Sequence, residues 1–112
     1  MSMTLREGYD DDVIVVLTRN GVVVDLSTIQ RATFYLINIL SDTTTTLDTL
    51  DNPTEIVVTK AVNGEITITA LPTFWSPAGH YRAYTDIILL SGKRRSFPSN
   101  RDEDITIVES AP

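Results

Sequence analysis

One histidine and two acidic runs are the parts of this sequence with the side chains for acid–base or metal chemistry. His80 is the single histidine, and no neighbour in the sequence is placed to exchange a proton with it. Asp10–Asp12 and Asp102–Asp104 supply carboxylates, but neither run has the alternate ligand spacing with a central glycine that calcium loops use. We therefore expect a surface histidine and solvated charges near strand ends.

The sequence also lacks the common signatures of enzymes. It contains no Gly-x-Ser-x-Gly elbow and no glycine-rich phosphate loop. It contains no cysteine, which excludes disulfides, thiolate nucleophiles and cysteine-based zinc sites. These patterns predict a protein that is not an enzyme and that needs no cofactor.

Trp75 is the aromatic residue with the clearest potential for binding. It lies between Phe74 and Pro77, where an indole could stack on a sugar or anchor a partner protein. The structural interpretation, which we favour, is that it plugs one end of the core. A carbohydrate-binding or adhesion module using Trp75, Tyr84 and loop carboxylates is kept as the alternative function.

Length and charge narrow the class of protein. The chain of 112 residues is expected to form one domain over residues 1–112, with 42% hydrophobic residues. A net charge of −6 disfavours binding to nucleic acid, so we interpret Lys93–Arg95 as a solvated turn. No apolar run approaches the ~20 residues that span a bilayer, so we expect no membrane segment and synthesis in the cytoplasm.

The segment Gly79–Val108 contains the strongest strand pattern. Apolar residues alternate with polar ones from Tyr81 onward, which is typical of a strand with one buried face. The inward set is Tyr81, Ala83, Thr85, Ile87 and Leu89, and the outward set is His80, Arg82, Tyr84 and Asp86. A turn at Ser91–Lys93 follows, and the later Ile105 and Ile107 are expected on the same inner face.

Two earlier segments have contrasting signals. Val13–Leu17 is rich in β-branched residues, and Asn20-Gly21 follows it, which predicts a hairpin across residues 13–24 with a type I′ turn. Ser27–Leu40 fits a helical stripe with a capping box as well as an alternating strand. Because its flanks are β-patterned, we predict a turn at Ser27–Gln30 and a strand at Arg31–Ile39.

The remaining segments complete an all-β pattern. We expect a polar loop at Ser41–Thr46, a short edge strand at Leu47–Leu50, strands at Glu55–Lys60 and Glu65–Thr69 around Asn63-Gly64, and a proline-containing break at Leu71–Pro77. About seven short strands separated by turn signals are typical of an antiparallel β-sandwich.

The order of features from Gly64 onward resembles a known family. Gly64–Ile68 leads to Leu71–Thr73, then Gly79–Ala83, Phe97-Pro98 and Ile105–Ile107. This order is similar to that of immunoglobulin-like domains of phage structural proteins, such as the N-terminal domain of the baseplate upper protein. The resemblance implies an immunoglobulin-like sandwich and a non-enzymatic virion module of the tail, baseplate, neck or head, which assembles with its own copies or with other virion proteins.

Two strands are apolar on both faces. If Ile87 and Leu89 fill the core, then Ile88 and Leu90 point outward, as do Ile14 and Val16. On neighbouring strands these four side chains would make one exposed patch, which predicts a symmetric homo-oligomer. The alternative is that Thr4–Tyr9 or Ser41–Leu50 covers the patch.

Overall fold

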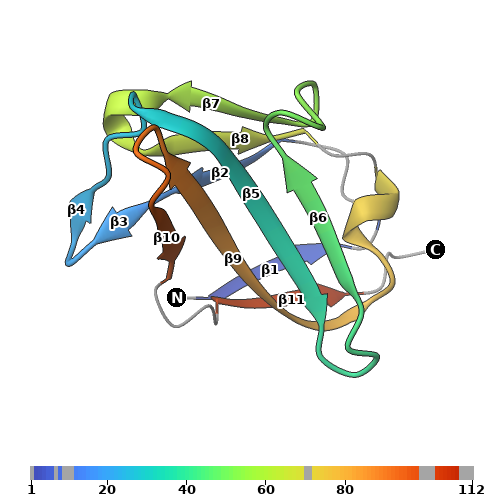
Figure 1. Cartoon of the computed structure of the whole chain (residues 1–112). Coiled ribbons are helices and arrows are strands. Elements are labelled where there is room, and N and C mark those ends of the chain that lie inside the picture. The colour runs from blue at the N-terminus through green and yellow to red at the C-terminus, as the bar shows by residue number, and fades with distance from the viewer. Residues whose placement is uncertain (1, 7, 9–11, 70–71, 99–102, 109–112) are drawn as a thin grey trace.

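The computed structural model describes residues 2–6, 8, 12–69, 72–98 and 103–108, and these residues form an all-β fold (Figure 1). Eleven strands are present in the described part of the chain, more than the seven or so expected from the sequence. The helical segments in that part are two short 3₁₀ turns, Ala61–Asn63 and Pro72–Trp75. The prediction of an all-β chain is confirmed.

The larger of two main sheets contains β1 (Ser2–Arg6), β5 (Ile29–Asn38), β6 (Thr44–Asp48), β9 (Gly79–Leu89), β10 (Arg94–Phe97) and β11 (Glu103–Val108). Its order is β1-β11-β9-β5-β6, and β10 also pairs with β9. β11 and β10 pair with successive parts of β9, through residues 79–83 and 85–88 respectively. All its pairings are antiparallel except that of β1 with β11, which is parallel.

The smaller sheet has three strands in the order β2-β8-β7, namely β2 (Val13–Val16), β8 (Glu65–Ile68) and β7 (Ile56–Lys60). Both pairings are antiparallel. A separate hairpin joins β3 (Thr18–Arg19) to β4 (Val22–Val23). Buried residues of the two main sheets form one hydrophobic core, so both sheets contribute their inner faces to it.

The alternating pattern of β9 produces the expected division between core and solvent. Tyr81, Ala83 and Ile87 are buried in the common core, whereas His80 and Arg82 are exposed. The predicted inner set is therefore confirmed, but Asp86, expected on the solvent side, is buried and accepts a hydrogen bond from the Ser96 hydroxyl. Ile107 is also buried, as expected, while the side chain of Ile105 lies outside the described residues.

The first predicted hairpin is present but shorter than expected. Asn20 and Gly21 have φ angles of 53° and 78°, the positive values that a type I′ turn needs. The paired strands extend only from Thr18 to Val23, because β2 pairs with β8 instead. β8 presents Ile66 and Ile68 to the core beside β2, and this burial outweighs the local pairing that the sequence favours.

The segment that fitted both a helix and a strand is the strand β5, which confirms the preferred interpretation. The polar threonine run was interpreted wrongly as a loop, because Thr44–Thr46 belong to β6 and pair with β5. Threonine is β-branched and suits a half-exposed edge strand, which explains the difference. Of the segment Thr4–Tyr9 that was considered as a cover, Thr4–Arg6 belongs to the edge strand β1 of the larger sheet, and residues 7 and 9 lie outside the described residues.

Candidate interaction site

The outer face of the smaller sheet carries exposed apolar side chains. Ile14 and Val16 on β2 are 57% and 48% exposed, and Val57 on β7 is 45% exposed. Ile14 pairs with Thr67 of β8, and Thr67 pairs with Val57, so the three residues form one row across the sheet. We call the surface made by Ile14, Val16, Val57, Thr59 and Thr67 the outer β2 face.

The polar residues of the outer β2 face bond mainly to one another. The Thr59 hydroxyl donates to a Glu65 carboxylate oxygen at 2.9 Å and lies 3.0 Å from the Thr67 hydroxyl. Threonine methyl groups remain beside the three aliphatic side chains. A surface of exposed aliphatic groups, with hydroxyls that are already hydrogen-bonded, suits contact with another protein.

β2 is also an edge strand with an open side. The Leu17 N–H donates to the Gly64 carbonyl at 2.9 Å, which places the backbone groups of the odd-numbered residues toward β8. The N–H and C=O groups of Ile14 and Val16 therefore point away from the sheet. Among the described residues no strand pairs with this edge.

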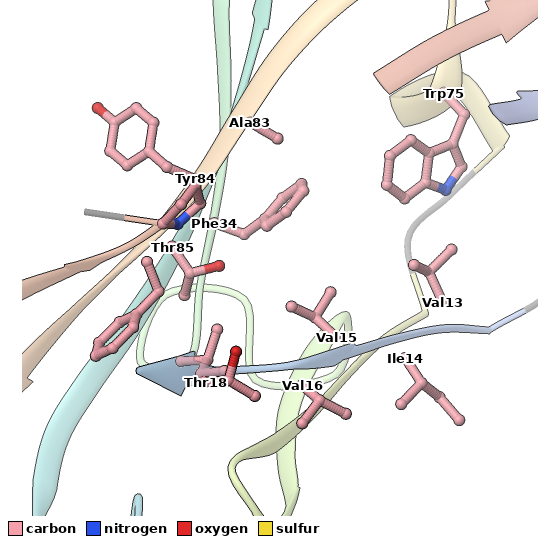
Figure 2. A pocket seen from close by; sticks show the side chains of 13 residues that line it. Val13, Ile14, Val15, Val16, Thr18, Phe34, Trp75, Ala83, Tyr84 and Thr85 are labelled. Carbon is pink, nitrogen blue, oxygen red and sulfur yellow. The ribbon is translucent and has the colours of Figure 1, made fainter. Parts of the chain in front are cut away.

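A cavity of about 230 Å³ lies behind β2, between the two sheets (Figure 2). Its lining includes Val13 and Val15 from β2, Phe34 from β5, Ala83 and Thr85 from β9, and Phe97 from β10. Most of the lining is apolar, and the cavity borders the open edge of β2. Edge and cavity together form a groove that could accept additional polypeptide.

Trp75 lines the same cavity and is fully buried. Its ring lies 4.7 Å from that of Phe74 and 6.3 Å from that of Phe34, centroid to centroid, and both pairs have edge-to-face geometry. This burial agrees with the core plug that we favoured and removes Trp75 from the exposed interaction residues. Its indole Nε1–H, however, has no hydrogen-bond partner among the described residues.

Ile88 and Leu90 do not join the outer β2 face. They belong to β9 and to the turn after it, whereas Ile14 and Val16 belong to the other sheet. Ile88 is half-buried and pairs with Arg31 on one side and Arg94 on the other, while Leu90 is 66% exposed. The expected single patch of four residues is therefore wrong. The reason is that β2 pairs with β8, not with a strand of the larger sheet.

The other sequence candidates have ordinary surface or structural surroundings. The Nδ1 atom of His80, on an exposed side chain, lies 3.4 Å from the Thr106 hydroxyl. Tyr84 stacks on Tyr35 with ring centroids 4.5 Å apart, so one face of each ring is already covered. Of the acidic runs, Asp12 accepts a hydrogen bond from Thr69, and most of the remaining carboxylates lie outside the described residues.

Asp48 is a buried acid on the larger sheet that sequence reasoning missed. Burial acts to raise its pKa, but hydrogen bonds from the Thr33 hydroxyl and the Leu50 backbone N–H, with the nearby Arg31 charge, outweigh burial and hold the pKa below its usual value. The Arg31 guanidinium lies 3.3 Å from the carboxylate. These partners are distant in sequence or backbone groups, so no local pattern could have identified them. The arrangement is structural.

Val57 was the other residue that sequence reasoning missed. Its segment was correctly predicted as a strand, but only the pairing of β7 with β8 shows that Val57 shares a face with Ile14. The signal available in the sequence was a second β-branched pair, Val57-Val58, with one member on each face.

No helix in the described part of the chain is long and apolar enough to cross a membrane. A scan against models of known protein families and a search of curated proteins both return no match.

Proposed function

We propose that this chain is a non-enzymatic immunoglobulin-like module of a phage virion that acts by assembling with other proteins. The observation that carries the assembly role is the outer β2 face, where the aliphatic side chains of Ile14, Val16 and Val57 remain exposed on one face of the smaller sheet. Exposed apolar surface of this kind marks contacts with other proteins.

Strand order supports the immunoglobulin-like part of the proposal. The order β11-β9-β5-β6 opposite β2-β8-β7 corresponds to strands G-F-C-C′ opposite B-E-D of an immunoglobulin domain. The Tyr81 hydroxyl near the start of β9 donates to the Pro77 carbonyl, as in the tyrosine corner of such domains. Against the seven-strand form, the chain has an extra hairpin, β3-β4, and the short strand β10.

The virion part of the proposal rests on the resemblance of the segment from Gly64 to Ile107 to phage structural domains. Mass spectrometry of purified particles from the source is the direct test. We expect peptides of this chain in a constant ratio to the major tail or head proteins. Particles that lack the chain would contradict the virion role. The assembly role would then be tested by measuring self-association.

Self-association is the assembly that is simplest to measure. Light scattering behind a sizing column should give a mass above 12.4 kDa at high micromolar concentration. Ile14→Lys should return the mass to that of a monomer, because a lysine that replaces this exposed aliphatic side chain must be desolvated for contact. Ile88→Lys is the matched control on the other sheet and should leave the mass unchanged.

A monomer at all concentrations would remove the homo-oligomer. The remaining form of the proposal is then assembly with other virion proteins alone, which the particle analysis measures. Equal dissociation by Ile14→Lys and Ile88→Lys would show that the outer β2 face is not the contact surface.

A further inference from the structure

We propose that the open edge of β2 and the cavity behind it bind an extended segment of a partner protein, which adds as a fourth strand to the smaller sheet. The segment would run antiparallel to β2 and carry apolar side chains at alternate positions. This inference rests on the proposed assembly function and specifies the mode of contact and the chemistry of the partner.

The backbone of β2 supplies the first argument. Ile14 and Val16 direct their N–H and C=O groups away from β8, and no described strand pairs with them. An added antiparallel strand would satisfy both residues through four main-chain hydrogen bonds. Edge strands are usually blunted by charges, proline or a covering loop, but β2 is made of four aliphatic residues.

The cavity supplies the second argument. A strand added beside β2 turns every second side chain toward the larger sheet, and the cavity of about 230 Å³ opens at that side. A volume of this size holds one or two aliphatic side chains. Val15, Phe97 and Thr85 would surround these side chains.

The unpartnered indole of Trp75 supplies the third argument. Its Nε1–H is fully buried without an acceptor among the described residues, and a buried donor without an acceptor is destabilising. In the view of Figure 2 the nitrogen lies on the side of the ring toward Val13 of β2. An incoming segment that brings a main-chain carbonyl oxygen within reach of this nitrogen would supply the missing acceptor.

The shape of the molecule favours a separate segment over a second copy of the whole domain. Pairing of β2 with β2 of another copy would place both larger sheets on the same side. In each copy β10 of the larger sheet lies near β2, because Phe97 at its end lines the same cavity as β2. The β10 strands of two paired copies would compete for the space beside β2, whereas a single extended segment fits there. A contact four residues long also provides too little area for a stable domain dimer.

Charges at the two ends of β2 define the partner further. Asp12 precedes β2, and Arg19 ends β3, which continues from β2; both side chains are exposed. An antiparallel segment would bring its N-terminal end toward Arg19 and its C-terminal end toward Asp12. The complementary segment therefore has an acidic residue near its start and a basic residue near its end.

The probe for this site is a synthetic octapeptide, blocked at both ends, with glutamate first, lysine last, and valines alternating with threonines between them. Trp75 is the only tryptophan, so the chain gives one indole N–H signal in a ¹H–¹⁵N spectrum. We expect saturable movement of that signal and slower hydrogen exchange at the amides of Ile14 and Val16. A peptide with serine in place of valine should bind at least tenfold more weakly.

Two variants of one residue separate strand addition from simple apolar contact. Val16→Pro removes a free edge N–H and no bond to β8, and proline is tolerated at such positions, so binding should fall at least tenfold. Val16→Thr replaces one methyl group of the valine with a hydroxyl but keeps the N–H, and should stay within about threefold of the original affinity. Circular dichroism establishes that both variants are folded.

If Val16→Pro does not fold, Val15→Phe replaces it. This change fills the cavity from β2 and leaves the edge N–H groups intact, so peptide binding should be lost while the fold is retained. The proposal would be overturned if Val16→Pro, or Val15→Phe in its place, bound the peptide as tightly as the original chain. It would also be overturned if the original chain did not bind the peptide at all. Movement of the indole signal with protein concentration alone would assign the edge to a second copy and overturn it too.

Failure of strand addition and failure of the proposed virion function give different experimental results. If the chain is present in particles and Val16→Pro is incorporated as well as the original chain, strand addition fails and the assembly role remains. If the chain is absent from particles but binds the octapeptide as described, the virion role fails and the strand-accepting site remains.

Discussion

On the outer face of the larger sheet, side chains find partners within the molecule, whereas on the outer β2 face apolar groups remain exposed. The larger sheet carries the Arg31–Asp48 ion pair, the Ser96 hydroxyl bonded to Asp86 at 2.6 Å, and the stacked rings of Tyr35 and Tyr84. On the outer β2 face the hydroxyls of Thr59 and Thr67 bond to each other, and the aliphatic side chains of Ile14, Val16 and Val57 are exposed to solvent. The two faces thus differ in whether their contacts are complete within the monomer.

This difference indicates where the molecule is stabilised and where it is available to others. A face whose polar groups are paired internally gains stability and has little reason to bind. Exposed aliphatic groups contribute little to the stability of the monomer, but their burial against a partner would favour association. Substitutions on the shared inner face, the larger sheet's outer face and the outer β2 face should therefore have decreasing effects on stability.

Substitutions on the inner face of the sheets should cause the largest loss of stability. Tyr81→Ala should lower the free energy of unfolding by about 3 kcal/mol, because it removes a buried aromatic ring and leaves a cavity. Urea titration measures the change. His80→Ala, one residue away on the opposite face of β9, should change stability by less than about 0.5 kcal/mol. The reverse ranking would contradict the register of β9.

The outer face of the larger sheet should show an intermediate effect. Asp48→Asn should lower the free energy of unfolding at neutral pH by about 2 kcal/mol, because hydrogen bonds to a charged group are stronger than neutral ones. Urea titration of the two proteins in the same buffer gives the difference. A loss below about 0.5 kcal/mol would show that the partners of Asp48 do not stabilise the monomer.

The contribution of Asp48 should also depend on pH in a defined direction. Its native pKa lies below the ordinary value of 3.8, so the carboxylate adds stability that is complete above that value and is lost as pH falls through the lower native pKa. The difference in free energy of unfolding between the original chain and Asp48→Asn should therefore become smaller only below about pH 4. Narrowing at a higher pH would contradict the lowered pKa.

The outer β2 face should show the smallest effect on the monomer. Ile14→Thr should change the free energy of unfolding by less than about 0.5 kcal/mol, since the side chain is 57% exposed and threonine also suits a strand. Measurement at low micromolar concentration keeps association out of the result. A loss above about 1 kcal/mol would show that Ile14 already has stabilising contacts within the monomer and would remove the contrast between the two outer faces.

Local patterns in the sequence correctly predicted the elements that depend on residues close together in the chain. The alternation from Tyr81 to Ile87 fixed the inner face of β9, and Asn20-Gly21 fixed a turn with positive φ angles. Both signals arise within a few residues, from side-chain period and from backbone sterics. The strand character of β5 was also recoverable, because the β-patterned segments on either side favoured one more strand over an isolated helix.

The candidate site could be predicted only in part, because it depends on which strands pair. Ile14 and Val16 were correctly expected to point outward, but their neighbours on the face are Thr67 and Val57 rather than Ile88. Which strand pairs with β2 depends on the burial of residues that are distant in sequence. The periodicity of a single segment gives no information about that pairing. The cavity behind β2 depends on the same distant pairings and left no local signal.

The parallel pairing of β1 with β11 has a mechanical consequence. Five pairs join the strands, from Ser2 beside Asp104 to Arg6 beside Val108. A force that draws Ser2 and Val108 apart acts along both strands in opposite directions, so it loads all five pairs together instead of opening them one at a time. Under tension applied at these two points, the larger sheet resists by shear, and its rupture force would report the unfolding rate of the whole pair rather than of its weakest bond.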